Sequence, residues 1–420
     1  MGFALNFLRL FYLKKSTQYL IIDSLLKKKY TTVDDLATDL YLSSPHIYRQ
    51  INKLKKLFAE FHIQLDFNSH TETNLISEEK HLRLFAYDFF WNSYKGIEWP
   101  FTNVNKNLIR KEINSYSISE KETSEELRFQ YLFSIIYIRG IIRGKCISLN
   151  KEMDQIIDSF MSVNNLSQSF ENTLLYSKIP YQRLDINAEK RFLNFTLRMA
   201  IFDLDNDEQK RKIVSNLLTL DNPIMNYTNL FVTDLIQSFQ LNLTPTERVY
   251  YLYYFTLLFM FIYYFDTDTQ AFNEKKLQKS FFNTKNHGKI GNDIINFHTN
   301  FSKKHPRIRK KIIKKKFNQT FYNVIYFILY SHLSRPIKVY LQFSRTILGK
   351  IFIKKQLTSF FSKDQLILTS DTGQADIIIS NSYEPFHKGV NFYYIDDFSD
   401  PCKWEDLISF IQRFIFNHNS

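Results

Sequence analysis

The sequence predicts a mainly α-helical protein with a small α/β domain at its C-terminal end. At 420 residues the chain exceeds the size of one ordinary domain core. Hydrophobic residues make up 44% of it while only 9 glycines and 9 prolines occur, which favours long buried helices. Short apolar segments that alternate with helical patterns begin only after Pro336. We expect four parts: a winged helix-turn-helix domain at 1–76, helical-bundle domains at 77–222 and 223–334, and an α/β domain at 335–420.

Charge and cysteine content restrict the partners and the compartment. A net charge of +13 and a pI near 9.3 favour an anionic partner, either nucleic acid or an acidic membrane surface. Cys146 and Cys402 cannot form a disulfide framework and lack metal-ligand spacing, so a reducing cytoplasm is expected. Residues 3–13 are apolar but lack the flanks of a signal peptide, and the Tyr-rich run at 249–265 is expected to be a buried helix rather than a membrane span.

Residues 16–58 predict three helices in series. The segment 16–29 begins with a capping Ser-Thr pair and has apolar residues at helical spacing. The segment 31–40 begins with two threonines and places acids in its first turn, where they favour the helix dipole. A tight link at 41–42 leads to a third helix that begins with Ser-Ser-Pro at 43–45, because a hydroxyl can cap free amides and proline suits the first helical turn.

The third helix, expected from Ser43 to Phe58, has one aliphatic and one cationic side. Its inner side is spaced by four, three and four residues and consists of Ile47, Ile51, Leu54 and Phe58. Its outer side contains no acid. The predicted DNA contacts are Ser43, Ser44, His46, Tyr48, Arg49, Asn52, Lys53, Lys55 and Lys56. A capped basic helix that follows a short turn is the arrangement that enters a major groove.

Within this set we expect two kinds of contact. His46 and Arg49, near the front of the helix, are the candidates for base edges, whereas Lys53, Lys55 and Lys56 are expected to bind phosphates. Apolar and polar residues alternate at 63–67, turn residues follow at 68–70, and 75–76 could form a returning strand. Together they predict a β-hairpin, which would complete a winged helix. An ordinary helical hairpin with a solvated basic face is the alternative.

The segment from Tyr30 to Phe101 resembles the Mga family of regulators, which includes the anthrax-toxin activator type. The matching features are DLATDLYLSSPHIYRQINKLKKLF, the later ISEEKHLRLFAYDFFW, and YKGIEWPF at 94–101. The last two are the more specific, because many unrelated regulators share the first. From the residues alone, 82–90 forms an apolar helical face that Gly96 and Pro100 terminate, so we assign this helix no chemistry.

The resemblance implies transcription control by direct promoter binding, usually activation, in a Gram-positive virulence-regulator context. It also implies two helical domains like phosphotransferase-regulation (PRD) domains and a C-terminal domain like a phosphotransferase IIB component. In such PRD-like domains histidines can accept phosphate from phosphotransferase-system proteins. His287 and His298 are the candidates here, with His305 nearby, because no histidine lies between His81 and His287.

Family members usually carry a further helix-turn-helix domain upstream. Only about 15 residues precede the first expected helix, so those upstream DNA contacts are expected to be absent. From 102 to about 333, helical patterns predict two bundles with a break at 221–223. The basic stretch at 303–316 has three open interpretations: a solvated surface, a second DNA contact, or a site for an acidic protein or lipid.

The C-terminal part predicts a small open α/β sheet. Its expected strands are IKVYLQF, QLILT, ADIIIS and VNFYYID, and its expected helices span 345–361 and 401–416. An active IIB domain would need a nucleophilic cysteine just after the first strand, where this chain has Phe-Ser-Arg-Thr at 343–346 while Cys402 lies far away. Phosphotransfer is therefore not expected. Within the family this module resembles a dimerisation element.

An enzymatic function is not expected. The sequence has no HExxH, CxxC, GxSxG or glycine-rich phosphate loop, so we expect no cofactor and no metal. We expect a cytoplasmic homodimer that binds double-stranded DNA, with phosphotransferase-system proteins as further partners and no membrane association. The alternatives are an RNA-binding antiterminator with related helical domains and a sensor that does not bind DNA.

Overall fold

The structure is a computed structural model that describes residues 2–68, 72–113, 123–167, 185–201, 203–267, 288–306, 319–333, 335–343, 349–382, 391–397 and 400–418. These residues confirm the predicted fold class, since they are mainly helical and end in a small parallel sheet. The chain forms two compact units. The first comprises Met1–Asp234, Leu243–Lys279 and Phe301–Thr320, and the second comprises Leu235–Asn242, Ser280–Asn300 and Phe321–Ser420.

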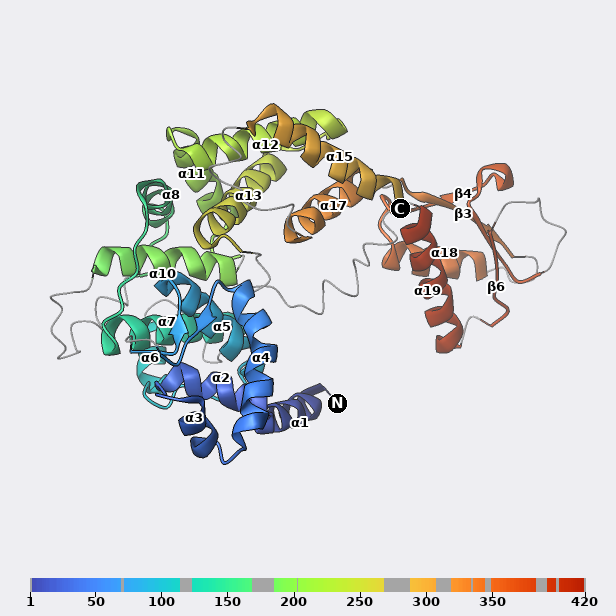
Figure 1. The fold of residues 1–420 in the computed structure, drawn as a ribbon. Helices are drawn as coiled ribbons and strands as arrows, with labels where there is room; N and C mark the ends of the chain where they lie inside the picture. The colour runs from blue at the N-terminus through green and yellow to red at the C-terminus, as the bar shows by residue number, and fades with distance from the viewer. Residues whose placement is uncertain are drawn as a thin grey trace. The chain divides into compact units, whose positions relative to one another are not determined.

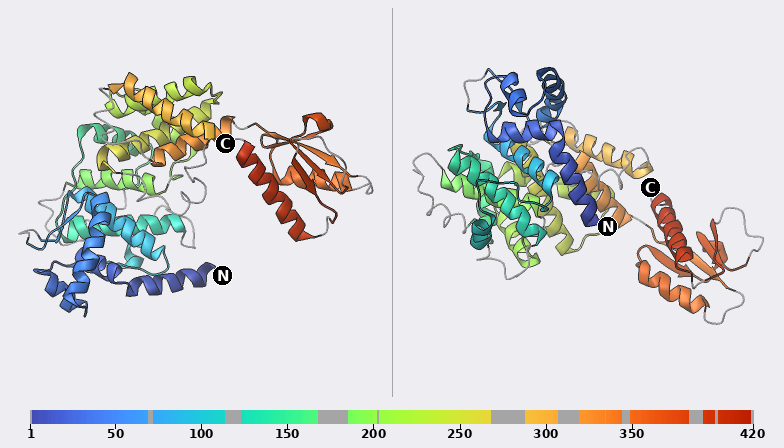
Figure 2. Two further views of the ribbon diagram at one scale, coloured as in Figure 1. Left: turned by 45° about the vertical axis from the view of Figure 1, so that its right-hand side comes forward. Right: turned by 90° about the horizontal axis from the view of Figure 1, so that it is seen from below.

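The N-terminal elements gather at one end of the first unit (Figures 1 and 2). They are α1 (Gly2–Lys15), α2 (Thr17–Lys27), α3 (Val33–Asp39), α4 (Ser44–Glu60), β1 (Gln64–Leu65), β2 (Leu75–Ile76) and α5 (Glu79–Tyr94). The three helices and the hairpin appear where the sequence predicts them. The additional helix α1 was not predicted; Arg9 joins it to the end of α5 by donating to the carbonyls of Asn92, at 3.1 Å, and Ser93, at 2.9 Å.

Side-chain caps explain where α2 and α3 begin. The hydroxyl of Ser16 accepts a hydrogen bond from the Tyr19 amide at 3.4 Å. Thr32 and Asp35 form a capping box, in which each side chain accepts from the other residue's amide at 3.0 and 2.9 Å. These are the starts that the threonine and serine pairs predicted.

In the middle of the chain all regular secondary structure of the described residues is helical. Its elements are α6 (Lys106–Ile113), α7 (Ser124–Ile136), the π-helical turn η1 (Tyr137–Ile142), α8 (Lys151–Met161), α10 (Ile186–Ala200), α11 (Asp207–Leu218), α12 (Pro223–Phe239), α13 (Pro245–Phe265), α15 (Gly288–Lys304) and α17 (Gln319–Leu333). The predicted break coincides with the start of α12, where the Asn222 side chain accepts from the Ile224 amide at 3.0 Å.

Helix α13 contains the apolar run at 249–265. Its residues Phe259, Met260 and Phe261 are fully buried, as expected for a helix inside a bundle. Within the described residues, no helix has both the length and the apolar content needed to cross a membrane.

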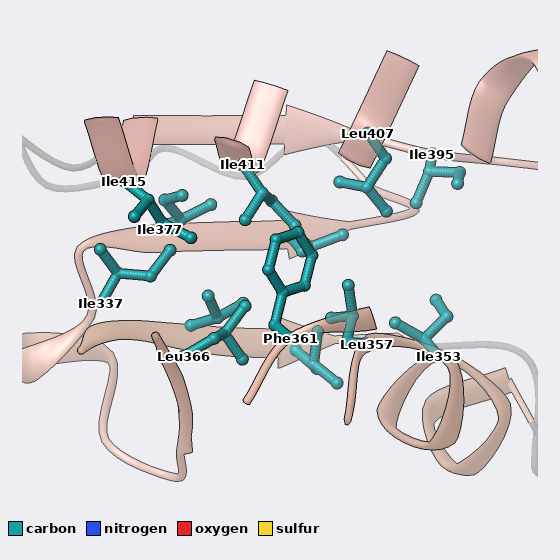
Figure 3. Packing of buried hydrophobic residues seen from close by; sticks show 13 residues of the cluster. Ile337, Ile353, Leu357, Phe361, Leu366, Ile377, Ile395, Leu407, Ile411 and Ile415 are labelled. Atoms are coloured by element: carbon teal, nitrogen blue, oxygen red, sulfur yellow. The ribbon is translucent and has the colours of Figure 1, made fainter. Parts of the chain in front are cut away.

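The C-terminal domain is a four-stranded parallel sheet with the order β4-β3-β5-β6. Its elements are β3 (Ile337–Gln342), α18 (Gly349–Phe360), β4 (Leu366–Thr369), the 3-10 turn η4 (Thr372–Gln374), β5 (Ile377–Ser380), β6 (Asn391–Tyr394) and α19 (Pro401–His418). Figure 3 shows Ile353 and Leu357 of α18, and Ile411 of α19, directed into one cluster with the strand residues. The predicted helix start at 345 lies outside the described residues.

Candidate nucleic-acid interface

Helix α4 is held by the aliphatic side that the sequence predicts. Ile47, Ile51, Leu54 and Phe58 are all buried, and the helix packs against α2 and α3. The Phe58 ring meets the Phe85 ring of α5 edge-on, with centroids 5.4 Å apart. Helix α4 is therefore anchored both to α2 and α3 and to α5.

The opposite side of α4 is open and cationic. Tyr48, Arg49, Asn52, Lys53, Lys55 and Lys56 are exposed, and no Asp or Glu occurs between Ser43 and Ala59. Residues 49, 53 and 56 follow one row of the helix, and 48, 52 and 55 follow the adjacent row. Six of the predicted contacts thus form one continuous surface, which we call the α4 face.

The start of α4 lacks the hydroxyl cap that the sequence predicts. Ser43 is the N-cap residue, but its exposed side chain makes no capping hydrogen bond, so the predicted hydroxyl cap is wrong. The reason lies in the next residues. Pro45 has no amide hydrogen to donate, and the His46 amide already donates to the Ser43 carbonyl at 3.0 Å. The Ser43 hydroxyl is therefore left on the surface beside the α4 face.

His46 is bound to the supporting helix. The residue is half-buried, and its Nε2 lies 3.1 Å from Thr17 Oγ1 at the start of α2. One ring nitrogen is thus used inside the domain, which makes Arg49, exposed one turn further along, the better candidate for a base contact. Ser44 is also half-buried.

The turn before α4 carries an exposed aromatic residue that the sequence analysis did not assign to the site. Tyr41 is 94% exposed and has a positive φ of 54°. Glycine or asparagine is usual in this left-handed conformation, so a tyrosine here is uncommon. The turn is closed by the Leu42 amide, which donates to the Ala37 carbonyl at 2.9 Å. The signal that could have identified Tyr41 is an aromatic residue at a turn position next to a helix start.

The hairpin is short and is fixed to the helices by a buried asparagine. Strand β1 pairs antiparallel with β2, with Gln64 opposite Ile76 and Leu65 opposite Leu75. The side chain of Asn74 bonds both the amide and the carbonyl of Tyr30, each at 2.8 Å. The hairpin tip, residues 69–71, lies outside the described residues.

Two histidines, His62 just after α4 and His81 on α5, bind the C-terminal end of helix α13. The Nε2 of His62 donates to the Asp266 carbonyl at 2.8 Å, and the Nε2 of His81 donates to the Phe265 carbonyl at 2.9 Å. Their rings lie 4.8 Å apart. Burial lowers the pKa of His81, an effect that its bond to Phe265 partly offsets.

The candidate phosphorylation sites remain predictions. His287 lies outside the described residues. His298 lies on α15 and is half-buried. His305 follows α15, with its Nε2 3.6 Å from a carboxylate oxygen of Asp234. Of the basic stretch 303–316, the structure describes residues up to 306, where Lys304 pairs with Asp234 at 2.9 Å.

The C-terminal domain presents a free cysteine at the start of α19. Cys402 is exposed, and its amide donates to the Asp400 side chain at 2.9 Å. The loop after β3 is described only at Phe343, so residues 344–346 of the expected phosphate-loop position lie outside the described residues.

Comparison with known proteins connects the N-terminal region to a family of regulators. Residues 2–90 match the Mga helix-turn-helix domain family, which runs from α1 into α5 and confirms the resemblance to Mga regulators. The chain is 25% identical over 174 residues, 38% of its length, to a Streptococcus pneumoniae serotype 4 protein named as a trans-acting regulator. It is 24% identical over 246 residues, 57% of its length, to the capsule synthesis positive regulator AcpA of Bacillus anthracis. These matches span 34% and 49% of the two relatives.

Proposed function

We propose that this chain, with its Mga helix-turn-helix domain at residues 2–90, is a cytoplasmic transcription regulator that binds promoter DNA through the α4 face. The observation that carries the proposal is that six polar or cationic side chains of α4 are exposed on one side while its four aliphatic and aromatic residues are buried on the other. Both relatives are named as regulators, and one is named a positive regulator, so we propose activation.

The proposed contacts divide by chemistry. Arg49 is the proposed base contact, because an exposed guanidinium can donate two hydrogen bonds to a guanine edge, and Asn52 and Tyr48 lie on the adjacent row. Lys53, Lys55 and Lys56, which are exposed, are the proposed phosphate contacts. Ser43, Ser44 and Tyr41 lie at the front of the helix, where a backbone phosphate would approach. His46 acts mainly by fixing α4 to α2.

The proposal includes self-association through the C-terminal sheet domain and no catalysis. No cofactor takes part. In the second unit, His298 is the described candidate for phosphate transfer from phosphotransferase-system proteins, and His287 is the other candidate from the sequence. A regulator that assembles as a dimer would present two α4 faces to a pair of half-sites.

The test selects bound fragments from pooled genomic DNA with the full chain and then compares variants by gel shift on the selected fragment. Arg49→Ala is expected to weaken binding by roughly 1–3 kcal/mol and to relax sequence preference at one position. Lys53→Ala is expected to weaken all sequences alike and to reduce the slope of log affinity against log salt by about 1. Lys212→Ala, an exposed lysine of α11, is the matched control. Equal binding by all four proteins would refute the α4 face as the DNA contact.

Self-association is tested separately by sedimentation velocity. Ile367 of β4 is 44% exposed, and Ile367→Asp is expected to shift the full chain toward monomer if the sheet domain forms the contact. If the sedimentation distribution is the same as that of wild type, the sheet domain does not form the dimer contact. The proposed DNA contact is not affected by that result.

A further inference from the structure

A pocket of about 170 Å³ lies inside the first unit, between the DNA-reading module and the helices that follow it. Leu26 and Lys27 at the end of α2 form one wall, and Phe90 of α5 forms another. Ile138 and Arg143, in and just after the π-helical turn η1, face them. π-helical turns occur frequently at functional sites, because the widened turn changes the direction of the side chains that follow.

The apolar walls determine the body of a ligand. Besides Leu26, Phe90 and Ile138, the lining includes Ile135 and Phe101. Cavities of about 150 Å³ with leucine, isoleucine and phenylalanine walls bind benzene. The pocket therefore has room for a ligand with one six-membered ring or a short branched chain.

The charge balance determines the head group. Arg139 donates two hydrogen bonds to Glu79, at 2.6 and 2.7 Å, and Arg83 pairs with both Glu79 and Glu189. Arg143, in contrast, donates to the carbonyls of Leu26 and Lys27, at 2.7 and 2.8 Å, and no ion pair joins it to a carboxylate of the described residues.

This cluster therefore holds three guanidinium groups against Glu79 and Glu189. Glu72 also acts on Arg143 but is itself paired with Lys145 at 2.8 Å, so one positive charge remains. That charge is at Arg143, which is half-buried beside the pocket. Burial and the neighbouring Arg139 lower the pKa of Arg143, and Glu79 and Glu72 offset this only in part, so an anion at this position would relieve an unfavourable environment. Nearby Lys27 is already paired with Asp23 at 2.6 Å.

We propose that this pocket binds a small monocarboxylate with an aromatic or branched hydrocarbon body, with the carboxylate on Arg143 and the body between Phe90 and Ile138. Such a ligand would contact the end of α2, which supports α4, and the turn η1 of the following helices. It would thus stabilise one arrangement of the two parts of this unit, which is the property of an effector site.

The probe is 4-fluorobenzoate, observed by ¹⁹F NMR with the full chain, and its neutral counterpart is 4-fluorobenzyl alcohol. We expect saturable broadening of the carboxylate signal, competition by benzoate, and at least 10-fold weaker binding of the alcohol, because a hydrogen bond to a charged group contributes about 1.5–3 kcal/mol. No DNA is present, so the result is independent of the DNA contact proposed above.

Two variants locate the binding. Arg143→Met is expected to weaken 4-fluorobenzoate by about 10-fold or more while leaving the alcohol unchanged, and Ile138→Trp is expected to abolish both by filling the pocket. Arg191→Met, at an exposed ion pair, is the control. Circular dichroism and thermal melting confirm that each variant folds, and Arg143→Lys, which keeps the charge, should restore part of the affinity. Absence of saturable binding, or binding that both pocket variants leave intact, would overturn the proposal.

Discussion

The cores of the first unit and of the C-terminal domain are built from different side chains. Around α5 the first unit packs aromatic rings edge-on: Tyr131 meets the rings of Trp91, Trp99 and Phe101 at 5.4, 5.6 and 5.4 Å. The buried cluster of the C-terminal domain consists of isoleucine, leucine and valine with a single phenylalanine, Phe361, and the aromatic side chains that pack against it are only partly buried. The helices of the first unit thus bury mainly aromatic side chains at these contacts, whereas the sheet domain buries mainly aliphatic ones.

The core of the first unit also contains a buried ion pair. Arg198 pairs with Asp205 at 2.6 Å, and both side chains are almost completely buried. The Tyr253 hydroxyl and the Asn164 side-chain amide also donate to the Asp205 carboxylate, at 2.6 and 2.7 Å. In the described part of the C-terminal domain, by contrast, the pair between Lys403 and Asp396 joins exposed side chains. Helices lack backbone bonds between one another, so directional side-chain bonds can fix their packing, whereas the ladders of a parallel sheet fix it through the main chain.

The largest expected effect is the removal of one partner from a buried pair. Asp205→Ala leaves the Arg198 guanidinium buried without its carboxylate, and we expect a loss of about 3–5 kcal/mol in the unfolding free energy of the first unit. Urea denaturation followed by tryptophan fluorescence measures it in a Trp404→Phe background, where Trp91 and Trp99 report on the first unit alone. Asp158→Ala, at the exposed pair with Arg191, should cost less than about 1 kcal/mol. Equal losses in the two variants would contradict the structural role given to the buried charge.

The next effect tests the aliphatic core. Leu357 of α18 is fully buried in the sheet domain, and Leu357→Ala should destabilise that domain by about 2–5 kcal/mol through lost burial and the cavity left behind. Hydrogen exchange measured by mass spectrometry should show faster exchange in β3 and β5 and unchanged exchange in α5. Equal acceleration in α5 would mean that the two cores unfold together, and the comparison between them would then fail.

The sequence was sufficient to predict helices and strands that are buried on one side, because their apolar residues recur at a regular spacing. The spacing of Ile47, Ile51, Leu54 and Phe58 predicted both the buried and the open side of α4, and short β-branched runs predicted the strands of the sheet. Helix α1 was missed because apolar residues occur on every side of it. Leu5 and Leu8 are exposed while Leu10 is buried, so no period is visible.

Features that depend on distant partners could not be predicted. The bond between His46 and Thr17 joins residues 29 positions apart, and the Arg83–Glu189 pair joins residues 106 apart. Neither partner carries a local signal, because a charged residue on a helix is exposed in most cases. The cap at Ser43 failed for a different reason, since proline at the second helical position removed the amide that a hydroxyl would bind.

The smallest expected effect is a pH dependence confined to the first unit. Burial lowers the pKa of His81 in the folded state below its unfolded value near 6.5, so the neutral ring contributes stability that is present above about pH 6.5 and is lost as the pH falls. Lys80 and His62 oppose protonation and Glu78 favours it, and the ring also bonds Phe265 of α13.

Between pH 8 and pH 5 we expect a loss on the order of 1 kcal/mol, or about 2–4 °C in the melting temperature of the first unit, comparable with one hydrogen bond. His81→Gln should flatten this dependence. The C-terminal domain should melt independently of pH over the same range, because the described side chains of its core contain no ionisable group. The prediction is contradicted if the melting temperature of the first unit is the same from pH 8 to pH 5 in both wild type and variant. Protonation of the His81 ring would then not reduce the stability of the folded state.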